Sequence, residues 1–161
     1  MNVGDLKPKE LPIDFIMRYA WNPDAIQADE TDDYLRRWAQ QNFGEAHAEA
    51  ISGLVARYSK YNLWRKPEVQ STNIFSVVNH CEADRVTDLW CTLAHEADSV
   101  GQLMPQAYKD AYYQLVLYPV KASGRSGGNL IWPAAKNRAL CIGRERDGER
   151  LCAASRGIVY G

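Results

Sequence analysis

The stretch YKDAYYQLVLYPVKA, from Tyr108 to Ala122, constrains the fold more than any other part of the chain. Its apolar and aromatic side chains recur at the spacing i, i+3, i+4, i+7 and i+8, which places them on one face of a helix. They are Tyr108, Ala111, Tyr112, Leu115 and Val116. Pro105 precedes the stretch, and Pro119 is expected to interrupt the helix after about three turns. So much apolar surface exceeds the needs of a lone surface helix, so we predict the central helix of a bundle.

Four further segments repeat apolar side chains at helical spacing. They cover residues 11–22, 32–42, 45–62 and 79–103. The fold class predicted from these patterns is all-α, as an antiparallel bundle of about five helices followed by an irregular C-terminal tail.

The packing at the centre of the bundle follows from the apolar stripes. Leu115 is expected to be buried against a leucine of a neighbouring helix, namely Leu54, Leu89 or Leu93. A core position of this kind predicts that Leu115→Ala costs about 2–5 kcal/mol.

The pattern changes after the central helix. The glycine-rich run GRSGG at residues 124–128 is expected to break the helix. Beyond Arg138 the sequence has no helical or strand period. We therefore assign residues 1–138 to a helical bundle domain and residues 139–161 to an irregular tail, which is either disordered or read from a shifted frame.

The charge balance excludes several classes of partner. The formal net charge is −1, which gives no overall field to attract nucleic acid or an anionic membrane. No apolar run approaches the roughly 20 residues of a membrane span, and the N-terminal MNVGDLKPKE lacks the apolar core of a signal peptide. We expect no nucleic-acid or membrane partner, and the sequence leaves the cellular location open.

The cysteines and histidines suggest neither a metal nor a cofactor. Cys81 and Cys91 fall near opposite ends of one predicted helix, about 15 Å apart, which is too far for a disulfide. None of the three histidines belongs to a metal-binding motif. Reduced cysteines and no metal or cofactor are therefore expected. The acidic residues mostly occupy first turns and outer faces of helices, so we assign no catalytic pair.

Two clusters of aromatic and basic side chains stand out, one at the end of the first predicted helix and one at the end of the third. Their members are Arg18, Trp21, Asn22, Trp64, Arg65, Lys66 and Glu68. A planar aromatic beside a guanidinium suits a carbohydrate carboxylate or a protein interface. Alternatively, the basic side chains cap helix C-termini next to a structural tryptophan.

Five blocks of the sequence, in order, resemble one enzyme family. They are Leu6–Ile26, Arg36–Gly44, Arg57–Glu68, Leu103–Ser123 and Asn129–Arg138. Together they are similar to glycoside hydrolase family 115, whose members are xylan α-1,2-glucuronidases that remove glucuronic or 4-O-methylglucuronic acid from xylan. The residues after Arg138 depart from the family pattern.

The resemblance implies a part of such an enzyme that lacks the catalytic site. The blocks resemble the helical-bundle domain that follows the family's α/β and (β/α)₈ barrel regions, and neither the barrel nor the family's β-sandwich has a counterpart here. Family members are dimers, and the resemblance implies that the helical domain contributes to their interface. Trp21, Asn22, Arg65 and Lys66 are the residues onto which that role would fall.

Three functions remain open from the sequence. The favoured one is an accessory or oligomerisation module, catalytically silent alone, that forms a homo-oligomer. A second is a small carbohydrate-binding module for acidic xylan oligosaccharides. The third is a fragment that retains hydrolase activity, so whether the chain is an enzyme stays undecided.

Overall fold

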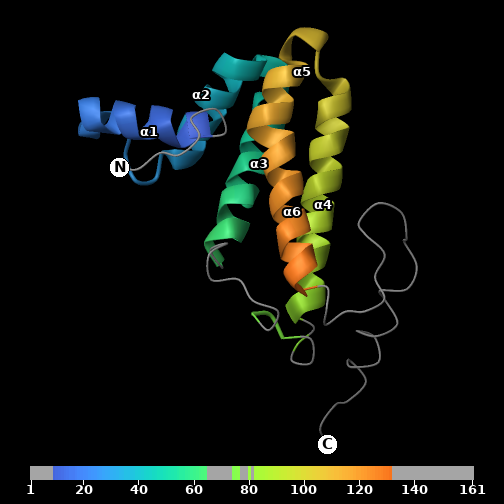
Figure 1. Ribbon diagram of the computed structural model, residues 1–161. Helices are drawn as coiled ribbons and strands as arrows, with labels where there is room; N and C mark the ends of the chain where they lie inside the picture. Colours follow the sequence, from blue (N-terminus) through green and yellow to red (C-terminus); the bar gives the residue numbers. More distant parts are fainter. Residues whose placement is uncertain (1–8, 65–73, 77–79, 81, 132–161) are drawn as a thin grey trace, which may run out of the picture.

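The computed structural model describes residues 9–64, 74–76, 80 and 82–131, with residues 125–131 described by their backbone alone. Within those ranges all regular structure is helical, so the all-α prediction is confirmed (Figure 1). The elements are α1 (Glu10–Trp21), the 3-10 turn η2 (Pro23–Ala25), α2 (Thr31–Phe43), α3 (Glu45–Trp64), α4 (Glu82–Leu103), α5 (Gln106–Tyr112), the π-helical turn η4 (Tyr113–Leu117) and α6 (Tyr118–Ile131).

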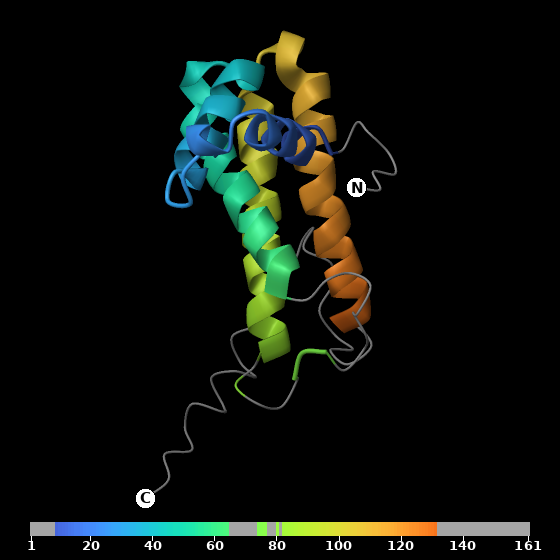
Figure 2. The same ribbon diagram turned by 90° about the vertical axis from the view of Figure 1, so that its left-hand side faces the viewer.

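Three long rods form the body of the bundle. The views in Figure 1 and Figure 2 show α3, α4 and the continuous α5–η4–α6 rod running side by side, each antiparallel to the next along the chain. Helix α2 packs beside α3 at the end where α3 begins, and α1 projects sideways from the bundle there, roughly perpendicular to the rods. None of the described helices has the length and apolar character that a membrane crossing requires.

The core collects side chains from α2 to α6. Phe43, Ile51, Leu54, Leu93 and Val116 are fully buried within it. The ring of Phe43 meets that of Tyr112 edge-on, with ring centroids 6.0 Å apart, an arrangement that aromatic pairs prefer. Ion pairs on the outside join the rods, Arg57 of α3 to Glu96 of α4 and Lys121 of α6 to Asp98 of α4.

The central helix differs from its prediction in two ways. Tyr112, Val116 and Val120 are its buried residues, whereas Leu115 is only partly buried and Tyr108 is exposed. Nor does Pro119 end the helix, which passes it and continues as α6.

The π-helical turn before Pro119 accounts for both corrections. There the N–H of Tyr118 donates to the carbonyl of Tyr113, five residues earlier, because η4 has a wider turn than an α-helix. Proline lacks an N–H and its ring crowds the carbonyl four residues earlier, so a local widening lets the helix continue. The inserted residue shifts the inward face from the α-helical positions to a spacing of four, at Tyr112, Val116 and Val120.

The glycine-rich run was also predicted wrongly, since α6 continues through residues 124–128 as helix. A glycine in a helix costs only about 1 kcal/mol relative to alanine, so neighbouring contacts can outweigh it. Gly124 lies against Trp90 of α4, where an added Cβ would sit 3.9 Å from that side chain. The predicted tail at residues 139–161 lies outside the described residues.

The cysteine expectation needs a correction as well. Cys91 is disulfide-bonded, whereas a reduced thiol was expected. Cys81 and Cys91 were expected to share one helix, but α4 begins at Glu82. Cys81, Cys141 and Cys152 lie outside the described residues.

Candidate functional site

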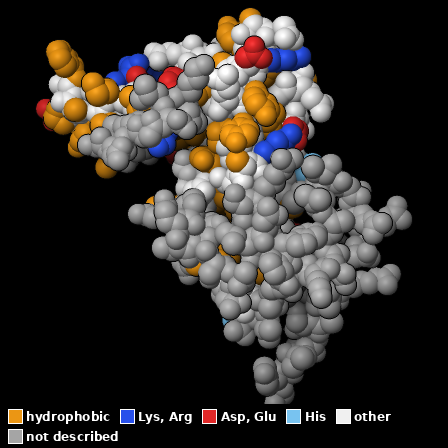
Figure 3. All heavy atoms as spheres, viewed as in Figure 1, with side chains coloured by type: hydrophobic (Ala, Val, Ile, Leu, Met, Phe, Trp, Pro, Cys, Tyr) orange, Lys and Arg blue, Asp and Glu red, His pale blue; other side chains and the backbone are white. Residues whose placement is uncertain are grey.

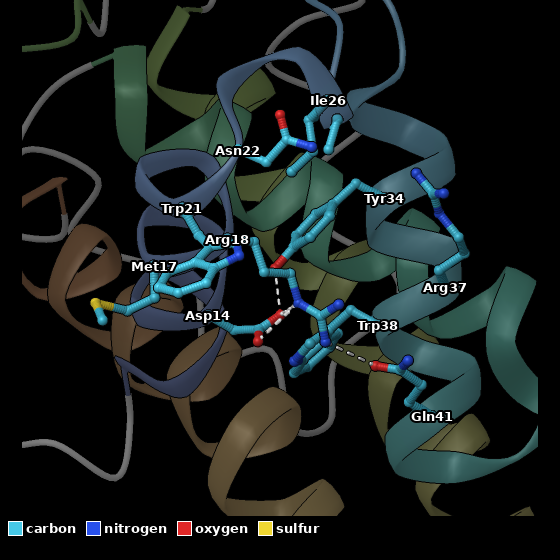
Figure 4. Close-up of a pocket in the computed structure, with 11 residues that line it drawn as sticks. Asp14, Met17, Arg18, Trp21, Asn22, Ile26, Tyr34, Arg37, Trp38 and Gln41 are labelled. Atoms are coloured by element: carbon cyan, nitrogen blue, oxygen red, sulfur yellow. Dashed lines mark hydrogen bonds and ion pairs between the residues drawn. The ribbon is translucent and has the colours of Figure 1, made fainter.

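An open groove of about 590 Å³ separates α1 from α2 (Figure 4). Met17, Arg18 and Trp21 line it from α1, and Arg37 and Gln41 line it from α2. The segment that joins the two helices closes one end. Helix α1 projects away from the rods and buries none of its own residues.

A buried tyrosine and a carboxylate hold α1 in place. Asp14 of α1 accepts a hydrogen bond from the hydroxyl of Tyr34 across 2.6 Å. It also accepts from Nε of Arg18, at 2.9 and 2.8 Å to its two oxygens. The Tyr34 ring meets Phe15 edge-on with centroids 5.1 Å apart. The i,i+4 spacing of Asp14 and Arg18 on one helix permits their pairing.

A second polar contact anchors the start of α1. Nε1 of Trp38, on α2, donates to Oε1 of Glu10 at 3.2 Å. Trp38 is 3% exposed, so this hydrogen bond satisfies an indole N–H that burial would otherwise leave without a partner. Helix α1 is therefore attached through a few specific contacts, and it buries none of its own residues.

Tyr34 and Arg18 keep fixed protonation states at neutral pH. Burial and the hydrogen bond to Asp14 raise the pKa of Tyr34 well above its usual value. The hydrogen bond to Asp14 raises the pKa of Arg18 as well. A neutral phenol and a charged guanidinium suit binding better than proton transfer, since general acid–base groups work best with a pKa near the operating pH.

The groove carries an excess of positive charge. Arg18 lines it from α1 and Arg37 from α2, and Asp14 is the one carboxylate among its described lining residues. Nη2 of Arg18 also reaches Oε1 of Gln41 at 3.4 Å. Arg37 makes no ion pair with any residue that the structure describes. One guanidinium therefore remains available to an anionic group from outside.

The structure brings the first predicted cluster together at this groove, since Arg18, Trp21 and Asn22 all line it. Their roles differ. Arg18 is committed to Asp14, and Oδ1 of Asn22 accepts from the N–H of Asp24 as the cap of η2. Trp21 is 92% exposed, so its ring is accessible at the groove.

The second cluster lies elsewhere, at the end of α3. Trp64 packs against Tyr61 with ring centroids 4.8 Å apart. With Phe75 and Arg85 it borders a shallower hollow of about 370 Å³. Its predicted neighbours Arg65, Lys66 and Glu68 lie outside the described residues.

Arg37, Tyr34 and Asp14 are among the groove residues that the sequence did not single out. The pair Arg36–Arg37 offers two guanidinium groups in sequence, and nothing in the pattern says which of them faces α1. Tyr34 is one of the buried residues of α2. Its hydrogen bond to Asp14 depends on how α1 crosses α2, which no periodicity reports.

Comparison with known proteins connects this region to an enzyme family. Residues 1–69 match the model of glycosyl hydrolase family 115, which confirms the resemblance over this part of the chain. The match includes α1, α2 and α3 and therefore both walls of the groove. A comparison with curated proteins found no match. The part of the chain that contains the groove is thus similar to a segment of family 115.

Proposed function

We propose that this chain is an accessory helical module of a family 115 glycoside hydrolase, catalytically silent by itself, whose role is self-association. The observation that carries the proposal is the state of α1. This helix buries none of its own residues, although Ile16, Met17, Tyr19 and Trp21 are large apolar or aromatic side chains.

The exposed side chains of α1 form an apolar surface next to charged groups. Their exposed fractions are 41% for Ile16, 64% for Met17, 48% for Tyr19 and 92% for Trp21. Figure 3 shows apolar side chains gathered on the part of the molecule that contains α1, beside acidic and basic ones. Apolar patches rimmed by charge are typical of protein interfaces.

The energy available from covering this surface is sufficient to favour association. At roughly 25 cal/mol per Å², and with roughly 150–250 Å² buried by an aromatic side chain, Trp21 alone would contribute several kcal/mol. Association costs at least about 4 kcal/mol in lost freedom of motion. The three other exposed side chains are therefore needed to give a net gain.

Catalytic silence is inferred from the carboxylates. Glycoside hydrolysis ordinarily uses a pair of them, about 5–10 Å apart, at the scissile bond. The groove has one lining carboxylate, Asp14, and the hollow beside Trp64 has one, Glu82. Both oxygens of Asp14 already accept hydrogen bonds within the chain, from Arg18 and Tyr34.

Light scattering across a dilution series tests self-association. We expect a homodimer or larger species at micromolar concentration, weakened by Trp21→Ala. Trp64→Ala is the matched control, because it removes the same side chain from a surface at the end of α3. A wild-type chain that stays monomeric at high concentration would contradict the proposal.

An activity assay tests whether the chain is catalytically silent. The purified chain should release no glucuronic acid from glucuronoxylan or from aldouronic oligosaccharides. Turnover that survives repurification and disappears on mutation of one carboxylate would show that the chain is an active fragment.

The exposed ring of Trp21 and the guanidinium of Arg37 line the same groove, which supports a second candidate, a carbohydrate-binding module for acidic xylan oligosaccharides. Aromatic faces and guanidinium groups are suited to sugar rings and carboxylates. Affinity electrophoresis in glucuronoxylan distinguishes the two. Retardation of a monomer, lost on Arg37→Ala or Arg65→Ala and absent with uncharged xylan, would favour the binding module.

A further inference from the structure

The segment that precedes and opens α2 is strongly acidic. Residues 24–33, DAIQADETDD, hold five acidic side chains and no basic one. Ala25 and Ile26 of this segment also line the groove. The acidic segment and the positively charged groove are therefore neighbours on one side of the molecule.

Several of these carboxylates make no ion pair with a residue that the structure describes. Oε2 of Glu30 accepts a hydrogen bond from the N–H of Gln27. Asp29 and Asp32 make no ion pair among the described residues. The helix dipole favours Asp32 in the first turn of α2. Asp29 and Asp32 are both exposed, so they are accessible to a basic side chain from outside.

The groove has the opposite charge imbalance, in favour of positive charge. Arg37 faces it without an ion pair among the described residues, and the nearby Asp14 is already bonded to Arg18 and Tyr34. A surface that holds unpaired positive and unpaired negative groups side by side can bind a rotated copy of itself. Two-fold dimers have interfaces of this type, in which residue i contacts j and j contacts i.

We propose that the occupant of the groove is a second copy of this chain, bound through its acidic segment. In this dimer Arg37 of each copy pairs with Asp29 and Asp32 of the other, while Trp21 and Met17 supply the apolar part of the contact. The inference rests on the proposed self-association and names its determinant. Apolar burial by α1 supplies affinity, and the reciprocal charge pairs set the orientation of the two copies.

Charge exchange between two variants tests this pairing. Arg37→Glu alone should weaken self-association by roughly tenfold or more, because it places like charges opposite each other twice per dimer. The double variant Asp29→Lys/Asp32→Lys should weaken it similarly. An equimolar mixture of the two should restore a dimer that contains one copy of each, since one set of pairs is then complementary again. Sedimentation velocity, with one variant fluorescently labelled, measures the association of each variant alone and of their mixture.

Matched controls separate a specific pair from general attraction between oppositely charged chains. Arg36→Glu makes the same charge change at an exposed neighbour that does not line the groove. Glu45→Lys/Glu49→Lys makes the same change as the acidic double variant, and Glu45 likewise stands in the first turn of a helix. These controls should self-associate like the wild type. Circular dichroism melts confirm that each variant is folded.

The outcomes distinguish the charge pairing from the self-association on which it rests. A monomeric wild type overturns both. A wild-type dimer that Arg37→Glu leaves unchanged, or whose two weakened variants fail to restore each other, overturns the charge pairing and leaves self-association through α1 in place. Restoration in the exchanged mixture, together with weaker binding as NaCl rises from about 50 mM to about 500 mM, supports the pairing.

Discussion

The hydroxyl of Tyr112 donates a hydrogen bond to the backbone carbonyl of Ala97 across 2.7 Å inside the core. Tyr112 belongs to α5 and Ala97 to α4, so the bond joins the two rods near the turn that connects them. Gly101 lies one helical turn beyond Ala97, where a Cβ would come within 3.0 Å of the tyrosine ring. The ring therefore occupies space that only glycine at that position leaves open.

Tyr112→Phe should lower the free energy of unfolding by about 0.5–1.5 kcal/mol, because it removes a buried hydrogen bond and keeps the ring. Urea melts followed by circular dichroism measure the change. Tyr113→Phe is the control, since that side chain is 51% exposed. Equal effects at the two positions would show that the bond to Ala97 contributes nothing.

Stability should also fall at alkaline pH. Burial raises the pKa of Tyr112, and burial with the hydrogen bond to Asp14 raises that of Tyr34. In the unfolded chain both tyrosines ionise near pH 10. Above that pH the unfolded state binds fewer protons than the folded state, so the free energy of unfolding decreases as the pH rises toward the folded-state pKa values.

Each of the two tyrosines should contribute a slope of up to about 1.4 kcal/mol per pH unit above pH 10. Tyr112→Phe and Tyr34→Phe should each flatten the dependence, and the double variant should flatten it further. Urea melts between pH 9 and pH 11.5 give the slopes, at roughly half-unit steps. A wild-type slope that neither substitution reduces would be incompatible with the raised pKa values.

Two helical glycines should respond to alanine with opposite signs. Gly101→Ala should destabilise the fold by about 1–3 kcal/mol, because the new methyl group presses on the ring of Tyr112. Gly53 in α3 has no other atom within 4 Å of an added Cβ. Gly53→Ala should therefore stabilise by about 0.5–1 kcal/mol through helix propensity. Thermal melts of both variants provide the comparison, and the same sign at both positions would contradict the packing.

Two leucines of α4 give a parallel test of the core. Leu93 is fully buried, whereas Leu89 is 39% exposed. Leu93→Ala should cost about 2–5 kcal/mol and Leu89→Ala clearly less, since the cost depends on the buried volume removed. Chemical denaturation measures both, and comparable losses would place the centre of the core elsewhere. Leu115, expected from the sequence at that centre, is only partly buried and should fall between them.

Apolar periodicity predicted the ranges of the helices well. It predicted poorly where a helix ends or changes its geometry. The third helix was predicted at residues 45–62 and runs over Glu45–Trp64, because its apolar stripe is long and uninterrupted. The central helix was predicted to stop at Pro119, and the inward face was misplaced at Leu115. Both errors come from the π-helical turn, a one-residue change in geometry that leaves no mark in a 3.6-residue pattern.

The groove could be predicted only in part. Trp21 and Arg18 stand out in the sequence as an aromatic beside a guanidinium, and both line the groove. Arg37 does not stand out, because its importance depends on which side of α2 faces α1. A helix such as α1, held by side chains far apart in sequence like Asp14 and Tyr34, takes its place through tertiary contacts that amphipathic spacing does not encode.

The last prediction concerns the attachment of α1. Asp14→Ala should release this helix from α2 without unfolding the bundle, because it removes the acceptor of both Tyr34 and Arg18 while α1 contributes no buried residue to the core. Backbone amides of α1 should exchange with deuterium roughly tenfold or more faster, and those of α3 and α4 should keep their protection.

Arg18→Ala is the control for this release. It removes the ion pair to Asp14 but keeps the hydrogen bond from Tyr34, and an exposed i,i+4 pair contributes only about 0.3–0.5 kcal/mol. Its exchange should therefore stay close to that of the wild type. If Asp14→Ala instead accelerates exchange in α3 and α4 as well, α1 is part of the cooperative core. If α1 is released alone, Asp14 sets how firmly the apolar side chains beside the groove are presented to a partner.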